Sequence, residues 1–207
     1  MKGQKDDLDN RDRTASAIED WTQLLGRENV FSDEETRAFY ARSTLPQGTA
    51  PSCILKPGGV EDLKGILKIA NRLRVGVYPI SRGNNWGYGD RNPVRSGDAV
   101  IDLGRMNRIL EVNETLAYAV IEPGVTQQQL HDHLKNAGLP LWLDSTGSGP
   151  DASILGNTLE RGFGHTPYGD HLLHTCGFEI ILADGRTLRT GFDHYAHAKS
   201  SRVFRYG

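Results

Sequence analysis

The stretch Pro79-Ile80-Ser81-Arg82-Gly83-Asn84-Asn85-Trp86-Gly87-Tyr88-Gly89 decides how this chain is interpreted. The apolar residues up to Ile80 predict a strand, and glycines at 83, 87 and 89 predict a loop after it. Glycine lacks a Cβ and tolerates positive φ, so main-chain N–H groups can gather around an anion. Asn84 and Asn85 also tolerate the left-handed region. The stretch therefore predicts a phosphate-holding loop that matches neither common nucleotide-binding fingerprint, with an ordinary glycine-rich turn as the alternative.

Length, composition and charge exclude several classes of protein. The chain has 207 residues and a formal net charge of -2. It shows no basic stripe, which argues against a nucleic-acid partner. No run of about 18 apolar residues occurs, so no membrane-spanning segment is expected. The charged segment Met1–Arg13 lacks the apolar core of a secretory signal. Cys53 and Cys176 lie far apart, which favours reduced thiols in a cytoplasmic protein.

Hydrophobic spacing predicts mixed helices and strands with short connections, which is α+β architecture. Residues 1–13 are expected to be a disordered lead-in. Helices are expected at 16–25, in the first part of 31–42, at 59–74 and 126–137, with a helical turn at 153–161. Strands are expected at 52–55, 77–80, 99–103, 108–112, 116–121, 139–143, 178–183 and 186–189. Thr126 and Gln129 form a capping box, and Asp184-Gly185 is a hairpin turn.

A second glycine-rich stretch covers residues 144–171, Asp-Ser-Thr-Gly-Ser-Gly-Pro-Asp-Ala-Ser-Ile-Leu-Gly-Asn-Thr-Leu-Glu-Arg-Gly-Phe-Gly-His-Thr-Pro-Tyr-Gly-Asp-His. Loops of this length inside a domain are usually functional. Gly156, Gly162 and Gly164 would let a flat aromatic ligand approach the main chain. The histidines at 165, 171 and 174 are poorly spaced for zinc and no cysteine pair accompanies them, so no metal site is predicted.

These stretches, with Val-Ile-Glu-Pro-Gly-Val-Thr at 120–126 and Leu-Ala-Asp-Gly-Arg-Thr-Leu-Arg-Thr-Gly at 182–191, resemble a known family. It is the vanillyl-alcohol oxidase / para-cresol methylhydroxylase flavoprotein family, and the resemblance covers residues 50–191. It implies the FAD-binding PCMH-type domain, in which FAD lies between two α+β subdomains. This domain would span 46–207, after a partly disordered or helical lead-in at 1–45. The family's cap domain is absent, so the domain is expected to be truncated at its C-terminus.

The resemblance also implies which residues bind the cofactor. The loop at 81–89 would wrap the FAD pyrophosphate, and Pro123-Gly124 with the segment 149–164 would border its adenosine and flavin parts. The cofactor-binding residues expected are Ser81, Arg82, Gly83, Asn84, Asn85, Trp86, Gly87, Pro123, Gly124, Ser148, Ser153, Gly156, Asn157, Glu160, Arg161, Gly162, Gly164, Tyr168, Gly169 and His171. Read without the resemblance, Tyr168 is a packed aromatic residue and Glu160–Arg161 a surface charge pair.

For the reaction, the resemblance implies hydride transfer from the benzylic carbon of a para-substituted phenol to flavin N5. Tyr88 occupies the position of the family tyrosine that binds the phenolic oxygen. His165 stands where the family often has another active-site tyrosine, a departure that could mean a different substrate. Ser148 is the nearest position to an acidic residue that some members place beside the flavin. The alternatives are FAD-dependent oxidation of another alcohol or of a hydroxy acid, and an inactive fragment.

Partners follow from the same resemblance. A small phenolic substrate is expected, and either oxygen or an electron-acceptor protein such as a cytochrome would reoxidise the flavin. The resemblance leaves open whether the chain forms a homo-oligomer and whether FAD is covalently held. Because the family's cap and C-terminal segments supply most of the substrate pocket, the chain alone is expected to be inactive and to bind FAD weakly or not at all.

Overall fold

The computed structural model describes residues 2–190, with side chains from residue 11 onward. Within these residues the chain divides into two compact units. The first unit comprises residues 2–105 and 181–186, and the second comprises residues 106–180 and 187–190. The predicted α+β architecture is confirmed, since both units combine helices with strands.

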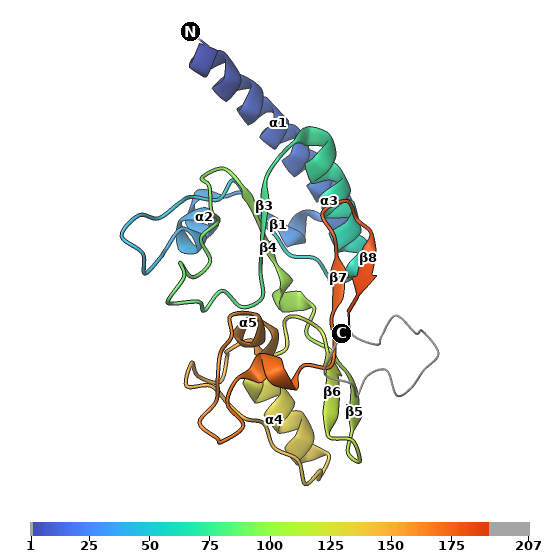
Figure 1. The fold of residues 1–207 in the computed structure, drawn as a ribbon. Coiled ribbons are helices and arrows are strands. Elements are labelled where there is room, and N and C mark those ends of the chain that lie inside the picture. Colours follow the sequence, from blue (N-terminus) through green and yellow to red (C-terminus); the bar gives the residue numbers. More distant parts are fainter. Residues whose placement is uncertain (1, 191–207) are drawn as a thin grey trace. The chain divides into compact units, whose positions relative to one another are not determined.

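The first unit is built around a four-stranded sheet (Figure 1). Its elements are α1 (Lys2–Leu25), the 3-10 turn η1 (Arg27–Asn29), β1 (Val30–Phe31), α2 (Glu34–Tyr40), β2 (Ile54–Leu55), α3 (Val60–Leu73), β3 (Val77–Ile80), β4 (Ala99–Asp102) and the 3-10 turn η2 (Leu103–Arg105). The strand order is β1-β2-β4-β3. Only the β1–β2 pair is antiparallel, so β2 and β3 run parallel on either side of β4.

Helices α1 and α3 lie side by side in this unit (Figure 1). Trp21 is fully buried among Ile66 and Ala70 of α3, and its indole N–H donates to the Ile66 carbonyl at 3.2 Å. The expectation of a disordered segment at 1–13 is wrong, because α1 already begins at Lys2. Residues 16–25 show the apolar spacing that indicates a helix, whereas the charged turns before them extend it without a hydrophobic stripe of their own.

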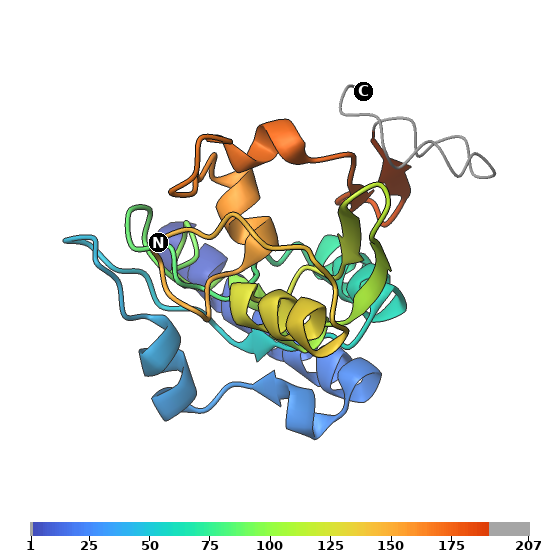
Figure 2. The ribbon, with the colours of Figure 1, turned by 90° about the horizontal axis from the view of Figure 1, so that it is seen from below.

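The second unit contains a hairpin and two helices around a smaller apolar cluster. Its elements are β5 (Ile109–Asn113), β6 (Tyr118–Ile121), α4 (Gln127–Asn136), α5 (Ile154–Leu159) and the 3-10 turn η3 (His171–His174). Val125, Leu130 and Leu134 are the buried centre of the cluster. Helix α5 and turn η3 contact each other, as Figure 2 shows from below. A separate two-stranded hairpin, β7 (Glu179–Ile181) with β8 (Thr187–Arg189), turns at the predicted Asp184-Gly185.

The predicted capping box at α4 is confirmed: the Thr126 hydroxyl accepts from the Gln129 N–H while the Gln129 side chain accepts from the Thr126 N–H. The predicted strand at 139–143 is wrong. Leu139, Leu141 and Leu143 alternate because they pack against the apolar cluster of this unit, not because they pair with a strand. Pro140 between them has no N–H to donate to a sheet.

Among the described helices, none combines the length and the apolar character needed to cross a bilayer.

Candidate functional site

The loop after β3 contains the positive-φ conformations that the sequence predicts, but only some of the expected residues adopt them. Gly83 and Gly89 have φ values of 68° and 105°. Asp90, with φ 56°, also adopts the left-handed region, whereas Asn84 and Asn85 do not. The turn closes through Asn85, whose carbonyl accepts from the N–H groups of Tyr88 and Asp90 at 3.0 and 2.9 Å. Gly83, Gly89 and Asp90, rather than the asparagines, therefore supply the positive-φ conformations of this loop.

The loop keeps a row of main-chain donors available. Within the described residues, the consecutive N–H groups from Gly83 to Gly87 donate no hydrogen bond. A Cβ added at Gly87 would meet nothing within 4 Å, so this side of the loop is open. Consecutive, unengaged N–H groups in a turn form an anion-binding concavity. Beside them the side chains of Trp86 and Tyr88 are 61% and 70% exposed.

The loop is held from beneath by residues that the sequence analysis missed. Asn92 is buried, and its side-chain oxygen accepts from the Thr49 N–H at 2.7 Å while its amide donates to the Tyr40 carbonyl at 3.0 Å. Asp90 accepts from the Thr44 N–H at 2.9 Å. These bonds join positions more than 40 residues apart, which no local sequence pattern reports. Residues 40–49 therefore help to hold the loop in place.

In the second unit, Glu122 fixes the turn that carries Pro123 and Gly124. Its buried carboxylate accepts from the Arg108 main-chain N–H at 2.8 Å and from the Arg108 guanidinium at 3.0 and 2.6 Å. Burial raises the pKa of Glu122, but the hydrogen bonds from the side chain and backbone of Arg108 outweigh it and leave that pKa lowered. Gly124 in turn donates to the Met106 carbonyl at 2.7 Å.

Ser153 and Gln127 connect this turn to the glycine-rich segment. The Ser153 hydroxyl caps α5 by accepting from the Gly156 N–H at 2.9 Å, and it donates to the Pro123 carbonyl at 3.3 Å. Gln127, buried at the start of α4, accepts from the Thr146 N–H at 2.8 Å and donates to the Gly149 carbonyl at 3.0 Å. Gln127 was not among the predicted residues, because its role depends on a loop 19 to 22 positions away.

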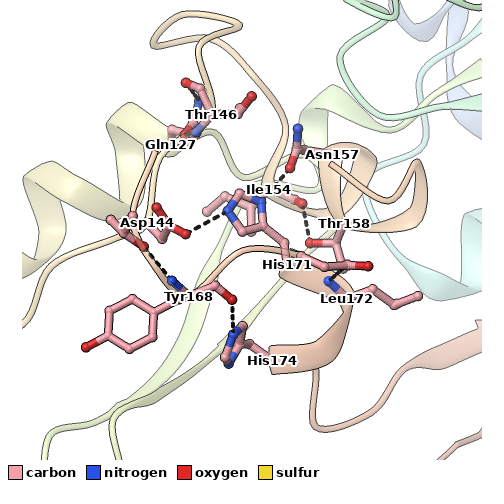
Figure 3. Close-up of polar contacts among 12 residues, drawn as sticks. Gln127, Asp144, Thr146, Ile154, Asn157, Thr158, Tyr168, His171, Leu172 and His174 are labelled. Atoms are coloured by element: carbon pink, nitrogen blue, oxygen red, sulfur yellow. Dashed lines mark hydrogen bonds and ion pairs between the residues drawn. The ribbon is translucent and has the colours of Figure 1, made fainter. Parts of the chain in front are cut away.

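His171 stands at the centre of the same segment (Figure 3). Its Nδ1 lies 2.6 Å from the Asn157 side-chain oxygen, and its Nε2 faces the Asp144 carboxylate at 3.4 Å. No hydrogen-bond partner among the described residues reaches the buried carboxylate oxygens of Asp144 or the Nε2 of His171. The Nε2 of His171 and the Asp144 carboxylate therefore face each other as a buried pair at 3.4 Å. His171 therefore links Asn157 of α5 to Asp144, and its side chain is largely buried between them.

The other predicted residues of this unit lie nearer the surface. His165 is exposed, with its Nε2 3.3 Å from the position of a Cβ on Gly147. Tyr168 is 70% exposed and meets the His174 ring edge-on at 6.1 Å between centroids. Arg161 pairs with Asp170 at 2.9 Å rather than with the neighbouring Glu160. The Ser148 hydroxyl lies 3.3 Å from that of Thr146.

Gly162 and Gly164 are required by close packing, because a Cβ there would lie 2.2 Å from the Asn157 side chain and 2.0 Å from Asp144. Gly169 has φ 71° and open space around it.

Two alternative chemistries find no support in the described residues. No group of three metal-ligating side chains occurs among them. Cys53 is buried, and burial raises the pKa of its thiol to about 12, so the thiol is protonated at neutral pH. The unengaged donors Gly83–Gly87 are suited to an anionic group such as a phosphate.

Comparison with known proteins decides the family. Residues 51–191 match the family described as FAD binding domain. The chain belongs to this FAD-binding family. A 1'-carboxy-chondrochloren decarboxylase of Chondromyces crocatus is 40% identical over 92% of this chain, and the 4-cresol dehydrogenase [hydroxylating] flavoprotein subunit of Pseudomonas putida is 34% identical over 92%. A p-cresol methylhydroxylase crystal structure superposes with a TM-score of 0.91 at 34% identity over 94% of this chain.

The superposition identifies the fold as that of the FAD-binding domain of p-cresol methylhydroxylase, as the sequence motifs implied. The cofactor of the family is FAD. The chain spans only 35% and 37% of the two relatives' lengths and 38% of the matched structure.

Proposed function

We propose that this chain is the FAD-binding part of an oxidoreductase that removes a hydride from the benzylic carbon of a para-substituted phenol. The observation that carries the proposal is the loop after β3. It combines the unengaged donors Gly83–Gly87 with the exposed hydroxyl of Tyr88. The similarity to proteins named for 4-cresol and p-cresol supports a phenolic substrate.

The protein's contribution is to hold the cofactor and to stabilise charge. The N–H groups of Gly83–Gly87 bind the pyrophosphate, and Tyr88 donates a hydrogen bond to the phenolic oxygen. When bound, FAD supplies the hydride acceptor, its N5 atom. Stabilising the phenolate eases hydride loss, because the electron pair of the phenolate oxygen moves into the ring and leaves a quinone methide, to which water adds. His165 is the second group proposed to stabilise the phenolate.

The remaining cofactor contacts are proposals on the same basis. Ser81, Arg82, Asn84, Asn85, Trp86 and Gly87 belong to the pyrophosphate loop. In the second unit, Pro123-Gly124 and the segment from Ser148 to His171 border the rest of FAD. We also propose that an electron-acceptor protein such as a cytochrome reoxidises the flavin, and that the protein works in the cytoplasm with reduced thiols.

The test is an absorbance titration of the purified chain with FAD. We expect a shifted, resolved flavin band at about one FAD per chain. Adding 4-cresol should then perturb this band, whereas D-lactate or glycolate should not. A response to the hydroxy acid and none to the phenol would favour the alternative oxidation. A folded chain that binds no FAD would contradict the proposal that the loop after β3 and the segment from Ser148 to His171 hold the cofactor by themselves. Replacing Tyr88 by Phe should weaken the 4-cresol response and leave FAD binding unchanged.

A decarboxylation is the second candidate function, favoured by the 40% identity to a decarboxylase. The same hydride removal generates a quinone methide. If the carbon next to the benzylic carbon bears a carboxylate, the C–C bond to that carboxylate breaks and CO2 leaves. The electron pair of the broken bond forms the new C=C bond, and the ring returns to a phenolate. With 3-(4-hydroxyphenyl)propanoate, this route predicts 4-vinylphenol and CO2, which mass spectrometry would separate from the hydroxylated acid.

A further inference from the structure

Arg91 lies directly beneath the glycine-rich loop. A Cβ added at Gly83 would lie 2.3 Å from its Cγ and 2.9 Å from its Nε. Gly83 also has φ 68°. The stem of Arg91 therefore occupies the space that any other residue at position 83 would need, so the two residues fix each other's geometry.

The guanidinium of Arg91 is oriented by aromatic rings and neutral acceptors. Its Cζ lies 4.9 Å from the centre of the Phe39 ring and 6.0 Å from that of Tyr40. Its Nη2 donates to the Asn84 side-chain oxygen at 3.2 Å and lies 3.4 Å from the Arg82 carbonyl. No ion pair among the described residues includes Arg91. Within the described residues, no paired carboxylate therefore neutralises the positive charge of Arg91 beneath the loop.

Arg82, the cation that the sequence singles out in the loop, is placed differently. Its Nη1 lies 3.1 Å from the position of a Cβ on Gly104, next to η2. The guanidinium of Arg82 therefore points back along the end of β4. Arg91, by contrast, bonds to Asn84, which stands among the unengaged N–H donors of Gly83–Gly87.

We propose that Arg91 is the residue that positions this loop for the FAD pyrophosphate and that its charge makes the loop select phosphorylated over unphosphorylated flavin. The proposal rests on the FAD-binding function proposed above. A guanidinium attracts a diphosphate through charge-assisted interactions, while riboflavin, which lacks phosphate, gains nothing from it. Arg91 contributes to binding and to loop geometry, not to the hydride step.

The test compares Arg91→Met and Arg91→Lys with a matched control, Arg42→Met. Arg42 also stacks on Phe39, at 5.4 Å, but no hydrogen bond from its side chain to the loop occurs among the described residues. We expect Arg91→Met to raise the Kd for FAD roughly 10- to 100-fold and to change the Kd for riboflavin less than about 2-fold. The affinity for ADP should fall in parallel with that for FAD. The Kd of Arg91→Lys for FAD should lie between those of Arg91→Met and the unmodified protein, and the Kd of Arg42→Met should equal that of the unmodified protein.

Salt dependence and hydrogen exchange separate charge selection from a purely structural role. The slope of log Kd for FAD against log salt concentration should become shallower in Arg91→Met. Without any cofactor, the amides of Gly83–Tyr88 should exchange faster in Arg91→Met and at the original rate in Arg42→Met. Equal loss of FAD and riboflavin would overturn the selection role, and unchanged exchange would overturn the positioning role. A protein that binds no FAD would refute the proposed function itself, while hydrogen exchange would still decide the positioning role.

Discussion

At the scale of single residues, the second unit depends on glycines that leave room for polar side chains. A Cβ at Gly164 would lie 2.0 Å from the Asp144 carboxylate, which is partly buried against His171. We predict that Gly164→Ala lowers the free energy of unfolding by about 1–3 kcal/mol, because the carboxylate would have to leave His171. Thermal or urea unfolding measures this. Gly147→Ala is the control, since the exposed His165 ring beside it can move. Equal stabilities of the two variants would contradict the prediction.

The sequence predicts contacts between residues that are close in the chain better than contacts between residues that are far apart in it. The capping box of Thr126 and Gln129 acts within three positions, so the sequence pattern indicates it. Ser153 caps α5 locally but also donates to the Pro123 carbonyl 30 positions away, a role that the sequence pattern does not report. Asn92 and Gln127 act through loops that are distant in sequence, and their side chains gain meaning only once the chain has folded. The predicted site residues likewise divide into exposed groups such as Tyr88 and supporting groups such as His171, which the motif alone does not distinguish.

At the scale of elements, the pairing of Glu122 with Arg108 ties the start of the β5–β6 hairpin to the turn after it. The lowered pKa of Glu122 means that its contribution to stability is full above the unfolded pKa of about 4.5 and is lost as pH falls through the lower folded pKa. We predict that Glu122→Gln costs only about 1–2 kcal/mol at neutral pH, because solvent around the largely exposed Arg108 side chain screens the ion pair.

The pH profile is the decisive measurement for Glu122. The unfolding midpoints of Glu122→Gln and of the unmodified protein should differ at pH 7 and converge as the pH falls below 4.5 and through the lowered folded pKa of Glu122. Glu114→Gln, an exposed carboxylate in the turn of the same hairpin, should show no such difference at any pH. A gap that persists unchanged into acid would show that side-chain shape, not charge, is what Glu122 contributes.

Helices were easier to predict than strands for a physical reason. A helix such as α3 satisfies its own hydrogen bonds, so apolar spacing suffices to indicate it. A strand needs a partner that the local sequence does not specify. Residues 139–143 alternate like a strand but pair with no strand in the described part of the chain, while Val30–Phe31 pairs with β2 despite being too short for any pattern.

At the scale of the whole molecule, the folded structure extends beyond the part that matches the family. The match begins at residue 51, yet α1, which precedes residue 51 in the sequence, packs against α3. Residues 40–49 also support the glycine-rich loop through Asn92 and Asp90. A boundary at residue 45, as the motifs suggested, would cut this support in two. The N-terminal segment is thus structural, and its loss should affect the loop as well as the core.

Trp21 gives the sharpest test of that conclusion. It is fully buried, packs with Ile66 and Ala70, and donates its indole N–H to a carbonyl of α3. We predict that Trp21→Ala lowers the free energy of unfolding by about 3–5 kcal/mol, since it leaves a large cavity and removes the indole hydrogen bond to the Ile66 carbonyl. Trp86→Ala, in the same unit but 61% exposed, should cost less than about 1 kcal/mol. Because α1 lies before the family match, similar unfolding curves for the two variants would mean that α1 is an appendage and that residues from 51 onward fold without it.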